Sequence, residues 1–142
     1  MEATNTFAQL EISYKNCVHN YRYFRSKLKP ETKLLVLIKA NAYGHGAVEF
    51  AKIMEKEGAD YFAVAHPWEG IELRQGGIKI PILVLTTGTD YYKEMVENKL
   101  EPGIPNLFSL EFFTNVLKEM NVTDYPVHIK LDTGMHRLGF MS

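Results

Sequence analysis

Apolar and polar residues follow a repeating pattern along the 142-residue chain. Residues 6–12 (TFAQLEI) alternate one by one, which predicts a half-buried strand. From Ser13 to Leu28 the apolar residues fall three or four positions apart, which predicts a helix with Ser13 as its N-cap. Five short apolar runs follow, of the kind that parallel strands covered on both faces require. These runs are residues 34–38, 61–65, 81–85, about 100–104 and 127–131.

Helical patterns lie between these runs, at residues 47–56, 67–75, 91–98 and 110–120. Pro67 suits the first turn of its helix, and Asp90 and Ser109 are the expected N-caps of the next two helices. Short strand-plus-helix units of this kind predict an α/β fold with a parallel sheet. That sheet is either doubly wound or part of a (β/α)8 barrel.

Chain length bears on the choice of architecture. A complete barrel needs about 250 residues, so five predicted strands can form only part of one. We therefore expect a partial (β/α)8 (TIM-type) barrel of about five parallel strands with intervening helices, preceded by an N-terminal strand and helix. Residues 1–32 are assigned to that strand and helix, and residues 33–142 to the first part of the barrel.

Composition narrows the possible functions. Hydrophobic residues make up 46% and charged residues 23%, as in globular proteins, and the net charge of −1 offers no basic surface for nucleic acid. The apolar runs are far shorter than the roughly 18 residues that span a bilayer, and the N-terminus lacks the pattern of a secretory signal. We therefore expect a cytoplasmic protein that binds neither nucleic acid nor membrane. A single cysteine and five histidines without ligand spacing predict no metal site.

The segment 39–46 (KANAYGHG) is the first candidate for chemistry, because active sites in α/β folds gather where strands end. Lys39 follows the first apolar run, and apolar surroundings favour a neutral, nucleophilic amine. Gly44 and Gly46 allow a tight turn before the next helix. The alternative interpretation is an ordinary lysine at a strand end whose side chain reaches solvent. Residues 44–49 (GHGAVE) match a dinucleotide-binding fingerprint only in part, which argues against a Rossmann fold.

The second candidate segment is residues 128–140 (HIKLDTGMHRLGF). Lys130 lies in the fifth apolar run and Arg137 follows shortly after it. Two cations this close require an anion, a modification that removes one charge, or solvent. A DTG turn with two exposed cations is the alternative. The chain contains no G-x-S-x-G motif, so a serine hydrolase is not indicated.

Three segments together resemble one enzyme family. They are KANAYGHG at residues 39–46, AVA-x(3)-EG-x(2)-LR at residues 63–74 and KLDTGMHRLGF at residues 130–140. In this order and spacing they resemble the fold-type III pyridoxal-phosphate (PLP) enzymes, and specifically the alanine racemases. The resemblance covers nearly the whole chain.

This resemblance implies a fold, an activity and partners. In the family an N-terminal (β/α)8 barrel precedes a β-rich C-terminal domain, and two chains form a head-to-tail homodimer. The rest of the barrel and the C-terminal domain are expected to be absent from this chain. The implied activity is that of a PLP-dependent isomerase, which interconverts L-alanine and D-alanine for cell-wall peptidoglycan.

The resemblance also implies roles for individual residues. Lys39 would hold PLP as a Schiff base and act as the base on the D-alanine side, and Tyr43 would hydrogen-bond the cofactor phosphate. Arg137 would face the PLP phenolic oxygen and the substrate carboxylate. Lys130 matches a position that is often carbamylated, and a carbamate there would pair with Arg137. Leu85 would line the pocket of the cofactor ring.

Racemisation needs a base on each face of the substrate carbanion. In the family the second base is a tyrosine from the partner's C-terminal domain, which would lie beyond Ser142. We therefore doubt that the isolated chain is active. Two alternatives remain open: a PLP-binding protein of the homeostasis type, and an inactive half-barrel whose exposed sheet edges favour association.

Overall fold

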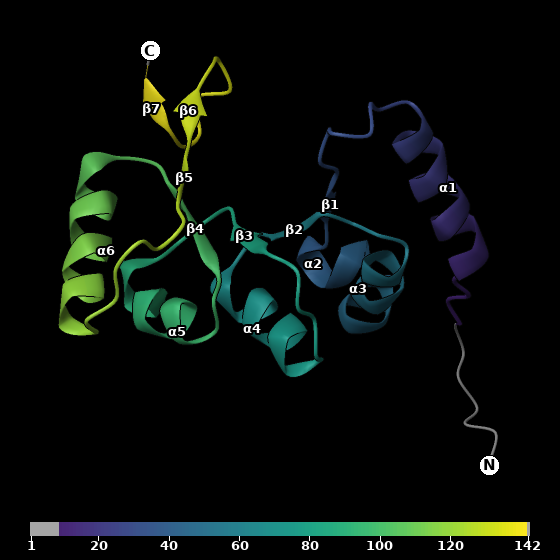
Figure 1. Ribbon diagram of the computed structural model, residues 1–142, viewed down its shortest axis with the longest axis horizontal. Helices are drawn as coiled ribbons and strands as arrows, with labels where there is room; N and C mark the ends of the chain where they lie inside the picture. Colours follow the sequence, from purple (N-terminus) through teal and green to yellow (C-terminus); the bar gives the residue numbers. More distant parts are fainter. Residues whose placement is uncertain (1–8, 142) are drawn as a thin grey trace.

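The computed structural model describes residues 9–141, and its elements follow the predicted repeat (Figure 1). The helices are α1 (Tyr14–Ser26), α2 (Lys39–Tyr43), α3 (Ala47–Lys56), α4 (Pro67–Gln75), α5 (Tyr92–Glu97) and α6 (Leu107–Glu119), with a 3-10 helix, η1 (Thr89–Tyr91), before α5. The strands are β1 (Leu35–Leu37), β2 (Tyr61–Val64), β3 (Ile82–Val84), β4 (Glu101–Ile104), β5 (His128–Ile129), β6 (Leu131–Asp132) and β7 (Phe140–Met141).

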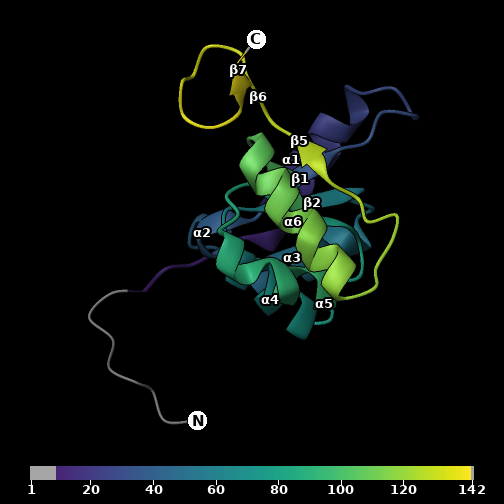
Figure 2. The same ribbon diagram turned by 90° about the vertical axis from the view of Figure 1, so that its left-hand side faces the viewer.

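The main sheet has the strand order β1-β2-β3-β4-β5, and every neighbouring pair is parallel. Figure 1 shows α3, α4, α5 and α6 along one side of this curved sheet, while α1 lies beyond β1 and contacts α3. The opposite side carries no helix within residues 9–141. Both views show β6 and β7, which pair with each other, standing away from the helical layer (Figure 2). The predicted α/β fold with five parallel strands is confirmed.

The hydrophobic core lies between the sheet and its helices. Alternate strand residues point to opposite faces of a sheet, and one alternate set is fully buried. It comprises Val64 and Phe62 of β2, Ile82 and Val84 of β3, and Ile104 of β4. The other set faces the helix-free side and is less uniformly buried, with Leu35 41% and Ala63 1% accessible to solvent. Parallel strands normally have both faces covered, whereas within residues 9–141 helices cover only one face of this sheet.

A cluster of three polar side chains lies at the amino-terminal ends of the strands. The hydroxyl of Tyr61 donates a hydrogen bond to Glu101, and the ring nitrogen Nε2 of His128 lies 2.7 Å from Oε2 of the same carboxylate. Burial, followed by this hydrogen bond, raises the pKa of Tyr61. The cluster therefore satisfies polar groups at the end of the sheet away from Lys39.

The structure confirms several predicted helix boundaries, but it shows no strand before α1 among the described residues. The helices predicted at residues 47–56 and 67–75 are confirmed as α3 and α4, with Pro67 in the first turn of α4. Ser13 caps α1 by accepting a hydrogen bond from the backbone N–H of Asn16. Of the strand predicted at residues 6–12, positions 6–8 lie outside the described residues, and residues 9–12 form no strand. Without a neighbouring strand to pair with, an alternating sequence has no ladder of hydrogen bonds.

Both predicted N-caps, Asp90 and Ser109, are wrong. Asp90 lies inside η1, and the residue that precedes α5 is Tyr91. Ser109 lies within the first turn of α6, and the cap is Asn106, whose Oδ1 accepts the backbone N–H of Ser109 at 2.8 Å. The first two residues of the helix, Leu107 and Phe108, face outward and lie outside its buried stripe. Hydrophobic periodicity therefore gave no signal for that turn.

Candidate functional site

The predicted site residues occur where the parallel strands end. Lys39 lies just after β1, Leu85 just after β3, and Lys130 between β5 and β6. Because the strands run in the same direction, these positions share one edge of the sheet. Arg137 lies in the loop between β6 and β7, on the same carboxyl-terminal side of β5. Active sites of α/β folds form at this edge.

Lys39 opens an unusual backbone segment. The four residues that follow it, Ala40, Asn41, Ala42 and Tyr43, all have φ between 51° and 54°, so α2 is a left-handed turn. Left-handed helical backbone costs roughly 1–2 kcal/mol per residue for L-amino acids. Such strain persists only where surrounding contacts fix it, and it concentrates at functional sites. The sequence did not predict this turn, because alanine and tyrosine carry no left-handed preference.

Hydrogen bonds hold the left-handed turn at both ends. The backbone N–H of Ala42 donates to the carbonyl of Ile38 at 3.0 Å, and that of Gly44 donates to Ala40 at 3.1 Å. Oδ1 of Asn41 accepts the N–H of Ala47 at 2.7 Å, which ties the turn to the start of α3. Gly44 continues the left-handed backbone with a φ of 90°, a conformation that glycine adopts without steric cost.

A carboxylate from the next βα unit also holds this segment. Oε1 of Glu69, in the first turn of α4, accepts the backbone N–H of Ala40 at 2.6 Å. Its other oxygen, Oε2, accepts the N–H groups of Ala65 at 2.7 Å and His66 at 2.9 Å. Sequence analysis missed Glu69 as a functional candidate. Its local signals were its place in the segment AVA-x(3)-EG-x(2)-LR and its position three residues after the N-cap His66, which is typical of a capping box.

Tyr43 stands beside Lys39 at the other end of the turn. Nζ of Lys39 lies 5.5 Å from the centre of the Tyr43 ring, and 59% of Tyr43 is exposed. Among the described residues no carboxylate forms an ion pair with Lys39. The structure thus leaves an amine and a phenol next to each other at the carboxyl-terminal edge of the sheet.

Lys130 contacts the end of β3. Its Nζ donates a hydrogen bond to the carbonyl oxygen of Leu85 at 3.0 Å. Gly103 leaves room for the lysine, since a Cβ there would lie 3.3 Å from Cδ of Lys130 and 3.0 Å from the carbonyl oxygen of Val84. Burial and the positive charge of Arg137 lower the pKa of Lys130. A lowered pKa favours the neutral amine, the form that reacts as a nucleophile.

The loop that carries Arg137 is fixed by backbone contacts. Oδ1 of Asp132 accepts the N–H groups of Gly134 and His136, both at 3.0 Å, and these bonds lower the pKa of Asp132. Phe140 donates its N–H to the carbonyl of Lys130 at 2.8 Å, which closes the loop. At Gly139, φ is 137° and a Cβ would lie only 2.7 Å from the backbone nitrogen of Asp132. This position therefore requires glycine.

The structure brings the predicted site residues into two groups. Lys39 and Tyr43 form one group, and Lys130 with Leu85 and Arg137 forms the other. Among residues 9–141 no hydrogen bond or ion pair connects the groups directly. A group bound between them would have to make that connection.

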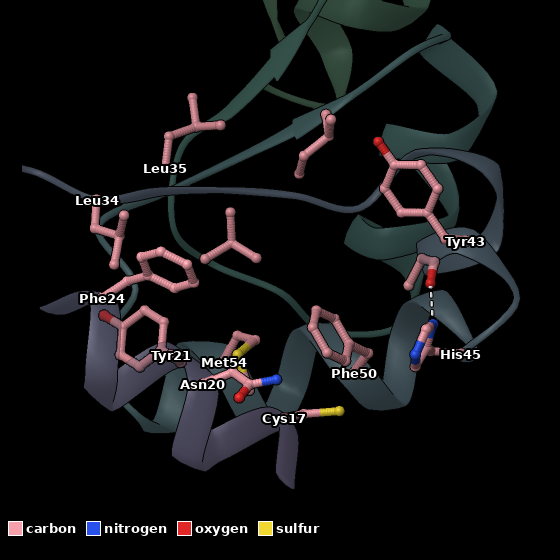
Figure 3. A pocket seen from close by; sticks show the side chains of 13 residues that line it. Cys17, Asn20, Tyr21, Phe24, Leu34, Leu35, Tyr43, His45, Phe50 and Met54 are labelled. Atoms are coloured by element: carbon pink, nitrogen blue, oxygen red, sulfur yellow. Dashed lines mark hydrogen bonds between the residues drawn. The ribbon is translucent and has the colours of Figure 1, made fainter. Parts of the chain in front are cut away.

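An apolar cavity of about 370 Å³ lies elsewhere, between α1, β1, α2 and α3 (Figure 3). Phe24 and Tyr21 of α1 and Phe50 and Met54 of α3 line it, and Tyr43 and His45 stand at one side. His45 Nδ1 lies 2.7 Å from the carbonyl oxygen of Ala42, so this histidine supports the left-handed turn. The charged members of the predicted site do not line the cavity. The candidate site is therefore the one at the strand ends.

Two other kinds of site find no support in the part of the chain that the structure describes. No group of three or more His, Cys, Asp or Glu side chains is arranged to hold a metal ion there. None of the helices in that part combines the length and the apolar character that crossing a membrane requires.

Comparisons with known proteins agree with this geometry. The family described as "Alanine racemase, N-terminal domain" matches residues 12–142. An alanine racemase of Synechocystis sp. is 41% identical over 134 residues, which are 93% of this chain and 36% of that protein. An alanine racemase of Methanococcus maripaludis is 40% identical, over 92% of this chain and 35% of its own length. The chain thus spans about a third of the curated relatives that it matches.

Solved structures show the same relationship. The alanine racemase of Clostridium difficile 630 superposes with a TM-score of 0.86 at 41% identity, over 89% of this chain and 33% of that one. A structure of the enzyme from Bartonella henselae, described as having covalently bound pyridoxal phosphate, has a TM-score of 0.83 at 27% identity, over 90% and 37%. The five parallel strands and their helices match the N-terminal part of these barrels. The chain therefore belongs to the alanine racemase family and corresponds to its N-terminal domain.

Proposed function

We propose that this chain forms the cofactor-binding part of a PLP-dependent alanine racemase, an isomerase that interconverts L-alanine and D-alanine for cell-wall synthesis. The observation that carries the proposal is the position of Lys39. It follows β1 at the active edge of the sheet and precedes a left-handed turn that neighbouring groups hold in place. The proposal includes a cytoplasmic location and a homodimer, as the family resemblance implies.

The residues present suit pyridoxal phosphate. The cofactor carries an aldehyde, a phosphate and a phenolic oxygen, which call for an amine, hydrogen-bond donors and positive charge. Lys39 offers the amine, and the hydroxyl of Tyr43 offers a donor beside it. Lys130 and Arg137 supply two positive charges near each other, with no carboxylate paired to either among residues 9–141. An anionic group between these side chains would relieve their repulsion.

Lys39 would hold the cofactor through its side-chain amine and move the α-proton of alanine on one face. When bound, pyridoxal phosphate supplies an electron sink that stabilises negative charge at the substrate Cα. Tyr43 would orient the cofactor by donating a hydrogen bond to its phosphate, and Leu85 would pack against its ring. Arg137 would bind the substrate carboxylate, because a guanidinium can pair with it through two hydrogen bonds.

Lys130 would act through Arg137. Its lowered pKa favours the neutral amine, whose nitrogen can bond to the carbon of CO2 with release of a proton. The carbamate so formed would be an anion beside Arg137 and would fix the guanidinium. We therefore propose that Lys130 is carbamylated and that it positions Arg137.

The opposite face of the substrate needs a second base. One base can only return the proton to the face from which it came, so racemisation requires another group. We expect a tyrosine of the C-terminal domain of a partner chain to supply it, as in the family. The 142-residue chain alone should therefore bind the cofactor more readily than it turns over alanine.

Chemical trapping tests the cofactor assignment. The protein as its source cell makes it would be incubated with PLP, reduced with borohydride and digested, and the labelled peptide identified by mass spectrometry. A pyridoxyl group on Lys39, absent in Lys39→Ala, is the expected result, together with loss of alanine racemisation in that variant. Label on another lysine, or near-normal turnover without Lys39, would refute the assignment.

A further inference from the structure

Glu69 joins two neighbouring βα units at the active edge of the sheet. Its side chain extends from the first turn of α4, and its two oxygens accept three backbone N–H groups from two different loops. We propose that Glu69 is a positioning residue, which fixes the direction in which Lys39 leaves the backbone. This inference rests on the proposed role of Lys39 as the cofactor lysine.

The position of Ala40 explains why a side chain must hold this point. Ala40 is the first left-handed residue, and the internal bonds of the turn begin only at the N–H groups of Ala42 and Gly44. The N–H of Ala40 therefore depends on Oε1 of Glu69, at 2.6 Å. That N–H belongs to the peptide that links Lys39 to Ala40. Fixing the peptide plane fixes the ψ angle of Lys39, and so the course of its side chain.

The second carboxylate oxygen of Glu69 anchors the side chain to a neighbouring strand and helix. Oε2 binds Ala65 and His66, at the junction of β2 and α4. Strand β2 pairs with β1 in parallel, so the anchor and the lysine belong to adjacent strands. Glu69 also lies at the amino-terminal end of α4, where the helix dipole favours a negative charge. The carboxylate thus holds the peptide that follows Lys39 in a fixed position relative to β2 and α4.

The chemistry requires a carboxylate at this position. Three N–H donors converge on the side chain, and an ionised carboxylate presents only acceptors. Glutamine has nearly the same shape, but its NH₂ group would face an N–H donor at one end or the other. Glu69→Gln therefore breaks one side of the bridge without creating a cavity. Glu69→Asp keeps the charge but shortens the reach by one methylene, so it should hold β2 and lose Ala40.

Glu55 offers a matched control. Its Oε1 accepts the backbone N–H groups of Lys79 at 2.8 Å and Ile80 at 3.0 Å, in the loop before β3. That loop lies at the amino-terminal ends of the strands, away from Lys39. Glu55→Gln thus makes the same carboxylate-to-amide substitution in another part of the fold, where the one accepting oxygen can be kept, so the charge is lost without the contact.

Two measurements on the protein made by its source cell test the proposal. The first is hydrogen–deuterium exchange in the segment 39–46, measured without PLP. The second is the rate at which borohydride traps PLP on Lys39. We expect Glu69→Gln and Glu69→Asp to speed exchange in the segment and slow trapping at least about tenfold, because small misplacements of a reacting group cost rate steeply. Glu55→Gln removes a negative charge of the same kind and should change neither the exchange nor the trapping rate.

If Glu69→Gln matched Glu55→Gln in both measurements, Glu69 would be an ordinary helix-capping residue and the inference would be wrong. Trapping at the normal rate despite faster exchange would also overturn it, because Lys39 would then not depend on the bridge. Absence of label on Lys39 in the unsubstituted protein would instead refute the proposed function. In that case, the exchange comparison alone would decide whether Glu69 holds the segment.

Discussion

Lys130 reaches the carbonyl of Leu85 by passing over Gly103, and this close approach makes the glycine testable. In Gly103→Ala the new Cβ would lie 3.0 Å from the carbonyl oxygen of Val84, which cannot easily move within the sheet. We expect a loss of about 1–3 kcal/mol in unfolding free energy, the usual cost of overpacking.

Gly88→Ala is the control for this substitution, because nothing lies within 4 Å of a Cβ at that position. Urea denaturation of both variants checks the prediction. Equal stability of the Gly103 and Gly88 variants would show that Lys130 and its surroundings can shift without cost.

Arg74 is another residue whose surroundings define its role. Its guanidinium donates to four backbone carbonyls, those of Ile78, Ile80, Asn98 and Lys99, at 2.8–3.0 Å. Two loops are thus joined by one planar group with a fixed fork of donors, which lysine cannot reproduce. We expect Arg74→Lys to cost about 1–3 kcal/mol of unfolding free energy, because several partly buried carbonyls lose their partners.

Arg22 provides the comparison for Arg74. It is exposed and pairs with Glu57, and surface ion pairs contribute little to stability. Arg22→Lys should therefore change the unfolding free energy by less than about 0.5 kcal/mol. Thermal or chemical denaturation of the two variants measures both values. A similar small effect at both positions would contradict the role assigned to Arg74.

At the level of elements, the sequence predicts what repeats locally and misses what depends on distant partners. Helix α3 is predictable because Ala47, Ala51 and Met54 recur at helical spacing and are buried against the sheet. The left-handed turn after Lys39 is not predictable, because part of its support comes from Glu69, 29 positions away from Ala40. Candidate chemistry could be located at residues 39–46 from the strand end, whereas the group that holds it could not.

Tyr125 connects the segment after α6 to α5 and to the residue before β4, and it gives that connection a pH dependence. Its hydroxyl lies 3.1 Å from the carbonyl oxygen of Met95 and 3.0 Å from that of Leu100. Burial, followed by the negative charge of Glu101, raises the pKa of Tyr125 to about 12 from its usual 10.0. The folded state therefore binds this proton more tightly than the unfolded state does.

The sign of the effect follows from this difference. The stabilisation that comes from the protonated Tyr125 hydroxyl is fully present below pH 10. It is lost as the pH rises from about 10 to 12, the window between the unfolded and folded pKa values. We expect a decline of at most about 2 kcal/mol from this residue. In Tyr125→Phe the unfolding free energy should start lower at neutral pH, for lack of the hydrogen bond, and fall less steeply above pH 10. An unchanged slope would contradict the prediction.

At the scale of the whole molecule, the sheet has one face under helices and one face open, and its outer strands β1 and β5 have free edges within residues 9–141 (Figure 1). Large apolar side chains of these outer strands are exposed, with 41% of Leu35 in β1 and 53% of Ile129 in β5 accessible. Unpaired strand edges and apolar patches promote association between chains. The 142-residue polypeptide, produced alone, should therefore form oligomers or aggregates.

Sedimentation velocity over a range of concentrations measures this association. Leu35→Lys and Ile129→Lys each place a charge at one edge strand, a device that natural sheets use against edge pairing. Each should shift the polypeptide toward the monomer, whereas an added charge on the already polar surface of α1, such as Asn16→Lys, should not. A monodisperse monomer of the unsubstituted polypeptide would show that the open face and edges are stable in water. The five-stranded unit would then be a folded domain by itself.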